Sequence, residues 1–201
     1  ADFEPMELQR MNIICIPLTV TFGDQDYQEN VNLSKPQFFE LLANLEGAPK
    51  TSQASPQILM DLFESAQAAG EEAIYITLSS ALSGTYQSAM IAADDYENIY
   101  VVDAGSVAMG NGILAEYALR LADEGKDAAE IFAALEEAKK KLVVVALVDT
   151  LEYLKKGGRV SKTVAFAGGL LNIKPVLSVT DGEINILGKA RGSKMGNNLL
   201  V

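Results

Sequence analysis

Hydrophobic residues recur every three or four positions in several stretches of the chain, and short, continuously hydrophobic runs lie between them. The first pattern is typical of helices that bury one face, and the second is typical of strands buried on both faces. The predicted helices cover approximately residues 34–46, 56–69, 85–94, 113–123, 128–141 and 151–156. The predicted strands are 13–22, 73–78, 99–103, 143–148, 173–179 and 183–187. The alternation of strands and helices as far as residue 148 favours a parallel sheet covered by helices on both faces.

Turn and cap residues refine this pattern. Pro17 interrupts the first predicted strand, so we expect an edge or a bulge there. Ser55 is a good N-cap for the second helix, because Pro56 follows it and suits the first helical position. The Asp181-Gly182 pair between the last two strands is a strong hairpin signal.

The pattern of predicted elements changes after Asp149, where an antiparallel hairpin replaces the alternation of strands and helices. The sequence therefore predicts an α/β fold with two domains: a parallel α/β domain over residues 1–141, and the start of a second α+β domain with antiparallel strands over 142–201. The second region has few strands for a stable sheet, so we expect a truncated chain in which several hydrophobic side chains lack a full partner surface. These are Val164, Phe166, Leu170, Leu171, Ile173 and Leu177.

Net charge narrows the classes of partner. The chain has 201 residues, with 16 Lys and Arg against 27 Asp and Glu, and its formal net charge is −11. Such an acidic chain repels phosphate backbones and anionic lipid heads, which disfavours nucleic-acid binding, including the role of a DNA-binding regulator. No apolar run reaches the roughly 18 residues that a membrane span requires, so we expect no integral membrane contact.

Two residue counts restrict the chemistry further. The chain has no histidine, which excludes from these residues Ser-His-Asp and Cys-His catalysis and any histidine-ligated metal. Its single cysteine, Cys15, forms no internal disulfide and fits a reducing, cytoplasmic location. We expect Cys15 itself to be a small core residue.

A cluster of hydroxyl groups follows the strand predicted at 73–78. Ser79, Ser80, Ser83 and Thr85 lie within seven residues, between the end of that strand and the start of a helix. In open α/β sheets the carboxyl ends of strands bind ligands, and free N–H groups at a helix start favour an anion. Serine and threonine also cap helices routinely, so the residues alone leave both interpretations open.

A second hydroxyl-rich turn, Thr51-Ser52-Gln53, precedes the helix that begins after Ser55. Taken alone it is a capping segment. Because it repeats the loop–helix arrangement of the first cluster, the two loops could converge on one anion.

Glycine and cation motifs add weaker candidates. Gly110-Asn111-Gly112 begins a G-x-G-x-x-A match, but it lies seven residues beyond Asp103 and lacks the context of a dinucleotide fingerprint. The cluster Lys155-Lys156-Gly157-Gly158-Arg159 is either a basic helix end or a guanidinium at a cleft that suits carboxylate or phosphate. Arg191 is a second, weaker case of the same kind.

Five segments, in this order along the chain, resemble the DegV family of fatty-acid-binding proteins. They are TSQASP (51–56), SSALSGTYQSA (79–89), LEYLKKGGRVS (151–161), LNIKP (171–175) and Arg191-Gly192. The resemblance implies a two-domain α/β protein that holds one long-chain fatty acid, such as palmitate, between its domains. It also implies a partner: a fatty acid kinase that phosphorylates the bound carboxyl to an acyl phosphate for phospholipid synthesis.

The resemblance further implies a carrier subunit, not an enzyme, and no cofactor. In the family, the threonine of the T-S-Q motif and a serine of the S-S-x-L-S-G-T motif bind the carboxylate, which carries over to Thr51 and to Ser80 or a neighbour. The expected carboxylate-binding set is Thr51, Ser52, Ser79, Ser80, Ser83, Gly84 and Thr85. Arg159 and Arg191 are expected to contact the head group or the kinase. The family pattern also has an Asp-Ser-rich first strand and a histidine at the carboxylate, and neither is in this sequence.

The alternative is an enzyme that acts on a small carboxylated or phosphorylated metabolite at the same hydroxyl-rich loops. Such an enzyme would show turnover, whereas a carrier would co-purify with stoichiometric lipid.

Overall fold

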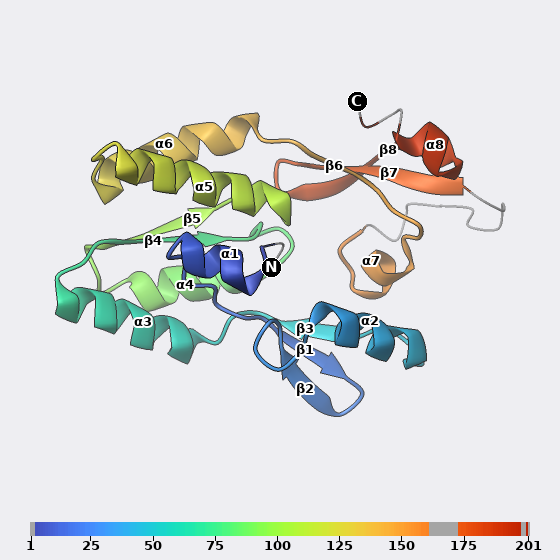
Figure 1. The fold of residues 1–201 in the computed structure, drawn as a ribbon, viewed down its shortest axis with the longest axis horizontal. Coiled ribbons are helices and arrows are strands. Elements are labelled where there is room, and N and C mark those ends of the chain that lie inside the picture. Colours follow the sequence, from blue (N-terminus) through green and yellow to red (C-terminus); the bar gives the residue numbers. More distant parts are fainter. Residues whose placement is uncertain (1–2, 161–172, 198–199, 201) are drawn as a thin grey trace.

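The computed structural model describes residues 3–160, 173–197 and 200, and the fold of these residues is shown in Figure 1. The helices are α1 (Pro5–Arg10), α2 (Lys35–Asn44), α3 (Pro56–Ala69), α4 (Thr85–Ala93), α5 (Met109–Asp123), α6 (Ala128–Ala138), the 3₁₀ helix η1 (Lys139–Lys141), α7 (Glu152–Lys156) and α8 (Gly192–Asn197). The strands are β1 (Thr19–Phe22), β2 (Gln25–Gln28), β3 (Lys50–Ser52), β4 (Ala73–Thr77), β5 (Ile99–Asp103), β6 (Val144–Leu147), β7 (Ile173–Thr180) and β8 (Glu183–Arg191). The predicted α/β fold, with a parallel sheet among helices and an antiparallel sheet, is confirmed.

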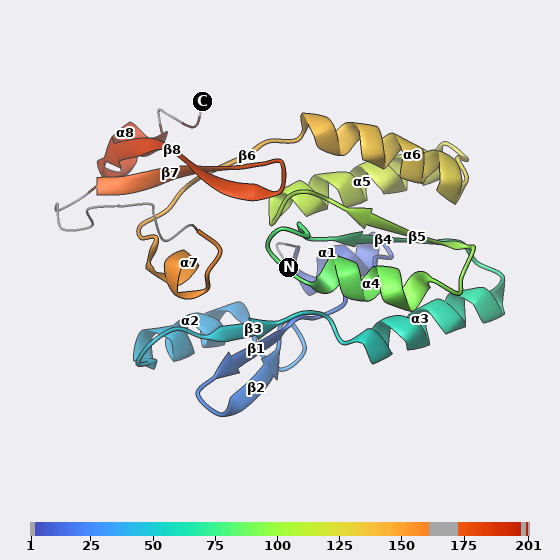
Figure 2. The same ribbon diagram turned by 180° about the vertical axis from the view of Figure 1, so that it is seen from behind.

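Strands β4 and β5 form the parallel sheet at the centre of three layers. Figures 1 and 2 show α5 and α6 on one face of this sheet and α3 and α4 on the other. Because side chains alternate along a strand, neighbouring residues of β5 enter different layers. Val101 packs in a cluster with Leu59 and Phe63 of α3, whereas Val102 packs in a cluster with Leu114 of α5. Burial on both faces explains why β5 is continuously hydrophobic up to its last residue.

The first predicted strand, 13–22, is wrong in its extent and its position. Strand β1 covers only Thr19–Phe22 and is the middle strand of an antiparallel sheet of order β2-β1-β3, not an edge strand. Pro17 lacks the N–H that a ladder requires, and pairing starts beyond it. The preceding residues Ile16 and Leu18 pack instead against the α3 and α4 layer.

The strand predicted at 143–148 does not join the parallel sheet. Strand β6 pairs antiparallel with β7, and β7 pairs antiparallel with β8, in a separate sheet of order β6-β7-β8. A hydrophobic run has the same composition in either orientation, so the sequence could not fix the partner. The predicted hairpin is confirmed: Asp181 and Gly182 connect β7 to β8 with positive φ angles of 53° and 79°, as a type I′ turn requires. The domain boundary after residue 141 stays a prediction.

The expectation that the end of the chain leaves hydrophobic residues without cover is wrong for the residue that can be checked most directly. Leu177 lies in the middle strand β7, between β6 and β8, and is 5% exposed. Ile173 is half-buried. Val164, Phe166, Leu170 and Leu171 lie outside the described residues.

Candidate functional site

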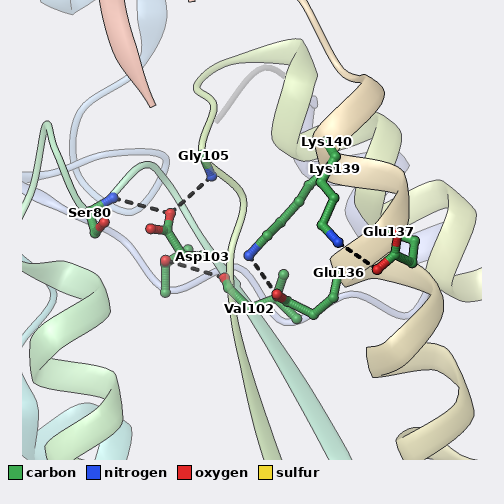
Figure 3. A network of polar contacts seen from close by, with 9 residues as sticks. Ser80, Val102, Asp103, Gly105, Glu136, Glu137, Lys139 and Lys140 are labelled. Carbon is green, nitrogen blue, oxygen red and sulfur yellow. Dashed lines mark hydrogen bonds and ion pairs between the residues drawn. The ribbon is translucent and has the colours of Figure 1, made fainter. Parts of the chain in front are cut away.

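The candidate site lies at the carboxyl ends of the two parallel strands. Thr77 and Asp103, the last residues of β4 and β5, are register partners. The loops that follow these strands therefore start side by side. Figure 3 shows Asp103 between the two loops: one carboxylate oxygen, Oδ1, accepts hydrogen bonds from the N–H of Ser80 at 3.1 Å and the N–H of Gly105 at 2.9 Å. One side chain thus holds both loops.

A third loop joins them through Ser79. This serine is 0% exposed, and its hydroxyl donates to the carbonyl oxygen of Gly182, in the β7–β8 turn, at 2.6 Å. The Ser79 Oγ atom also accepts a hydrogen bond from the N–H of Ala81 at 3.2 Å. A Cβ atom at Gly182 would lie 2.7 Å from Ser79 Oγ, so the turn approaches the loop closely because it carries glycine. The hairpin tip is therefore part of the wall of the site.

The TSQASP segment (51–56) contacts the SSALSGTYQSA segment (79–89), as the sequence predicts. The side-chain amide of Gln53 donates to Ser88 Oγ at 2.6 Å, and the N–H of Ala54 donates to Thr85 Oγ1 at 3.4 Å. A Cβ atom at Gly84 would collide with the Gln53 side chain. Glycine at position 84 therefore permits the two segments to come together.

The expected cradle of free backbone N–H groups is not present over most of this loop. The N–H of Ser79 donates to the Ser106 carbonyl, and those of Leu82 and Ser83 donate to the Ser79 carbonyl. The N–H groups of residues 80, 81 and 85 are bound to side-chain oxygens. The loop uses its donors to hold its own shape, so side-chain hydroxyls remain as the principal contacts for an anion.

The predicted carboxylate-binding residues divide into two groups. Ser79 and Thr85 are buried, and the hydroxyl of Thr85 pairs with that of Ser83 at 2.9 Å, so these groups are structural contacts of the loop. Thr51, Ser52 and Ser80 are exposed. Thr51 sits on β3 opposite Val20 of β1. Each of these exposed hydroxyls can donate one hydrogen bond to a carboxylate oxygen.

The two predicted cationic contacts lie in different places. Arg159 is exposed, and its Nε donates to the carbonyl oxygen of Leu82 in the hydroxyl-rich loop at 3.2 Å; its Nη1 donates to the Gly157 carbonyl. Arg191 is the last residue of β8, paired with Ile173 at the end of the hairpin opposite the turn. At roughly 3.3 Å per strand residue, the length of β8 separates it from the candidate site.

The G-x-G-x-x-A match has a packing role. Helix α5 begins at Met109, earlier than predicted, so Gly110 and Gly112 lie inside its first turns. A Cβ atom at Gly110 would collide with Ser106, and one at Gly112 would lie 3.0 Å from the ring of Phe3. Both glycines permit close packing, and because they lie within the helix, the match lacks the strand–turn–helix context of a nucleotide site.

Two further sequence expectations need correction. Cys15 is exposed and not a core residue, because it lies in the irregular segment before β1; partial desolvation of its sulfur raises the pKa of the thiol. Ser55 precedes α3 but makes no side-chain cap hydrogen bond.

Sequence reasoning missed Asp103 and Gly182 as parts of the candidate site, and it included Gln53 only as the last residue of the T-S-Q turn. The position of Asp103 at the end of a buried strand was a usable signal, because carboxyl ends of parallel strands meet at one edge. The contact with Gly182 spans 103 positions, and no local pattern indicates it.

Other kinds of site find little support in the described part of the chain. No group of three or more Cys, Asp or Glu residues there is placed to hold a metal ion, and no helix there is long and apolar enough to cross a membrane. A depression of about 460 Å³ is lined by Gln67, Gly70, Asp95, Glu97 and Asn98, at the opposite end of the sheet from the hydroxyl-rich loops.

Residues 1–200 match the family described as "Uncharacterised protein, DegV family COG1307". A DegV domain-containing protein of Caldanaerobacter subterraneus is 39% identical over 190 residues, which cover 93% of this chain and 67% of that relative.

Solved structures of two bacterial proteins have the same fold. One is a DegV family protein from Thermus thermophilus, whose structure concerns fatty acid binding. It has a TM-score of 0.89 and 31% identity, and the match covers 99% of this chain and 71% of that one. Another is the Fatty Acid Kinase (Fak) B3 protein of Streptococcus pneumoniae loaded with linoleic acid, with a TM-score of 0.82 and 28% identity, covering 93% of this chain and 68% of that one.

Proposed function

The chain belongs to the DegV family, and on that premise we propose that it binds one long-chain fatty acid, such as palmitate, and presents the carboxylate to a fatty acid kinase. The observation that carries the proposal is the contact between the TSQASP segment (51–56) and the SSALSGTYQSA segment (79–89), through Gln53 and Ser88 and through Ala54 and Thr85. This contact joins two segments that both carry hydroxyl groups. The fatty acids bound by the Thermus and Streptococcus proteins supply the ligand class.

In this proposal the tail sets the affinity and the hydroxyls set the orientation. A C16 tail has about 15 methylene-type groups, and at about 0.8 kcal/mol each their burial contributes up to about 12 kcal/mol before association entropy is subtracted. A hydroxyl contact contributes about 1 kcal/mol net. Thr51 and Ser80 therefore act by holding the carboxylate in one place at the loop edge.

The phosphorylation itself belongs to the kinase in this proposal. An oxygen of the carboxylate attacks the terminal phosphorus of a donor nucleotide, the bond from that phosphorus to the leaving oxygen breaks, and an acyl phosphate forms. The role of this chain is to hold the nucleophilic oxygen at the surface, which is the role of a carrier subunit.

The first experiment separates binding from presentation. Thr51→Ala and Ser80→Ala should each weaken palmitate binding only about fivefold, because each removes one hydroxyl contact and leaves the tail buried. Acyl phosphate formation with the kinase should fall much further, because a poorly oriented carboxylate reacts slowly. Calorimetry and a coupled kinase assay measure the two effects. Wild-type rates in both variants contradict the assignment of the head-group site, and turnover of a small metabolite without retained lipid favours the enzyme alternative.

The second experiment tests the kinase contact. Arg159 is exposed beside Leu82, where its guanidinium can meet an anionic phosphoryl donor or an acidic partner surface. Arg159→Ala should lower the kinase rate without changing the melting temperature, and Arg191→Ala, at the far end of the hairpin, is the matched control. Equal effects of the two substitutions contradict the contact.

A further inference from the structure

We propose that Asp103 is a positioning residue for the ligand-binding hydroxyl of Ser80. This inference deepens the proposed function and rests on it, because it takes Ser80 as a carboxylate contact. Asp103 ends β5, a strand paired residue by residue with β4, so its Cα is held by the sheet. Its Oδ1 atom then fixes the backbone of Ser80 in the neighbouring loop at 3.1 Å.

The geometry separates the backbone of Ser80 from its side chain. The backbone is held on both sides: by Asp103 at its own N–H, and by the buried Ser79, whose hydroxyl binds the Gly182 carbonyl and the Ala81 N–H. The Ser80 side chain is exposed, and within the described residues its hydroxyl makes no hydrogen bond. A fixed backbone that carries a free hydroxyl is what a site needs to present that hydroxyl at one position.

Asp103 also binds the N–H of Gly105, and this second bond has two consequences. Gly105 has a φ of 56°, so the bond stabilises a turn that brings the β5–α5 loop close to Gly182. Two N–H donors also offset part of the negative charge of Asp103. That compensation lets a carboxylate remain at an edge where a second, ligand carboxylate is proposed to bind.

The experiment compares two ligands with the same tail: palmitate, which has a carboxylate, and hexadecanol, which has a neutral head. Asp103→Ala should weaken palmitate binding roughly fivefold, the value of one hydroxyl contact, and weaken hexadecanol binding by less, because a neutral hydroxyl accepts a weaker hydrogen bond than a carboxylate does. Asp103→Asn retains an acceptor oxygen and should recover most of the loss. The double variant Asp103→Ala with Ser80→Ala should bind palmitate as Ser80→Ala alone does, because Asp103 acts through Ser80.

Asp123→Ala, an exposed residue at the end of α5, is the matched control and should change neither ligand. Equal losses for palmitate and hexadecanol would mean that Asp103 only supports the fold, and additive losses in the double variant would mean that it acts independently of Ser80. Either result overturns the proposal.

A measurement without ligand keeps the positioning role separate from the proposed function. In amide hydrogen exchange, Asp103→Ala should expose the N–H groups of Ser80 and Gly105 together, while Asp123→Ala should leave both protected. If wild-type protein binds neither ligand, the proposed function fails. The amide exchange still tests whether Asp103 holds the N–H groups of Ser80 and Gly105. Unchanged protection at Ser80 overturns the positioning role whatever the ligand result.

Discussion

At the scale of single residues, burial changes the acidity of Tyr75. It lies on β4 and packs against the α3 layer, with its ring 6.2 Å from that of Phe63. Burial, with a smaller contribution from the nearby Cys15 thiol, raises the pKa of Tyr75 from 10.0 to about 12. The folded protein therefore resists ionisation of this hydroxyl over a pH range in which the unfolded chain ionises freely.

The sign of the stability effect follows from this shift. Because the folded-state pKa is raised, the contribution to stability is complete below pH 10 and is lost as the pH rises from about 10 to about 12, to a total of about 3 kcal/mol. Tyr75→Phe removes the titrating group, so the variant should lose less stability than wild type across that range. Urea unfolding of both proteins at pH 9 and pH 11.5 measures the difference. A parallel decline in the two proteins would show that other groups account for the alkaline loss.

Helix caps show how elements depend on local contacts. Asp127 caps α6 with a complete capping box: its carboxylate accepts from the N–H of Glu130 at 2.8 Å, and the Glu130 side chain accepts from the N–H of Asp127 at 3.3 Å. Ser55 stands at the equivalent position of α3 and makes no such bond.

Because only one of the two side chains caps its helix, alanine substitution at the two positions should lower the free energy of unfolding by different amounts. Asp127→Ala should lower the free energy of unfolding by about 1 kcal/mol, and Ser55→Ala should change it by less than about 0.5 kcal/mol. Chemical denaturation of the two variants beside wild type measures both. A loss for Ser55→Ala as large as that for Asp127→Ala would contradict the cap assignment.

Elements defined by local signals could be predicted from the sequence, and elements that depend on distant partners could not. Helix α3 and strand β5 match their predicted ranges closely, because hydrophobic spacing, Pro56 and Gly70 are local signals. The pairing of β6 with β7 and the shortness of β1 depend on distant partners, and a hydrophobic run does not encode its neighbour. Helix α1 has no buried residue and hence no apolar stripe that could have predicted it.

For the candidate site, residue types were predictable and their individual roles were not. The two hydroxyl-rich segments could be found as clusters, and their contact could be anticipated from the topology. Ser79 and Ser80 are adjacent and chemically identical, yet one is buried against Gly182 and the other is exposed. Only the packing of the hairpin tip on the loop distinguishes them.

At the scale of the whole molecule, Gly182 joins the antiparallel sheet to the edge of the parallel one. Its φ is 79°, and a Cβ atom there would lie 2.7 Å from Ser79 Oγ. Gly23, in the β1–β2 turn, has a similar φ of 61° but no neighbour within 4 Å of a Cβ position. Substitutions at Gly182 and Gly23 therefore share the cost of a positive φ, and only the one at Gly182 adds a close contact.

Gly182→Ala should destabilise the protein more than Gly23→Ala does, and the difference should be about 1 kcal/mol or more. Both variants carry the backbone penalty of a positive φ, but only Gly182→Ala also displaces Ser79. The melting temperatures of the two variants give the difference, and amide exchange at Ala81 shows whether the loop has moved. Equal melting temperatures would mean that the tip does not press on the loop.

The bond between Ser79 and Gly182 also has a consequence for the timing of biosynthesis. Its partners are 103 residues apart, and at translation rates of about 5–20 residues per second the second partner is made roughly 5–20 s after the first. Throughout that interval the nascent polypeptide has the hydroxyl-bearing loop without the turn that anchors it. The parallel layers of the fold can assemble early on the ribosome, whereas the loop that contains Ser80 reaches its final shape only when the hairpin has been synthesised.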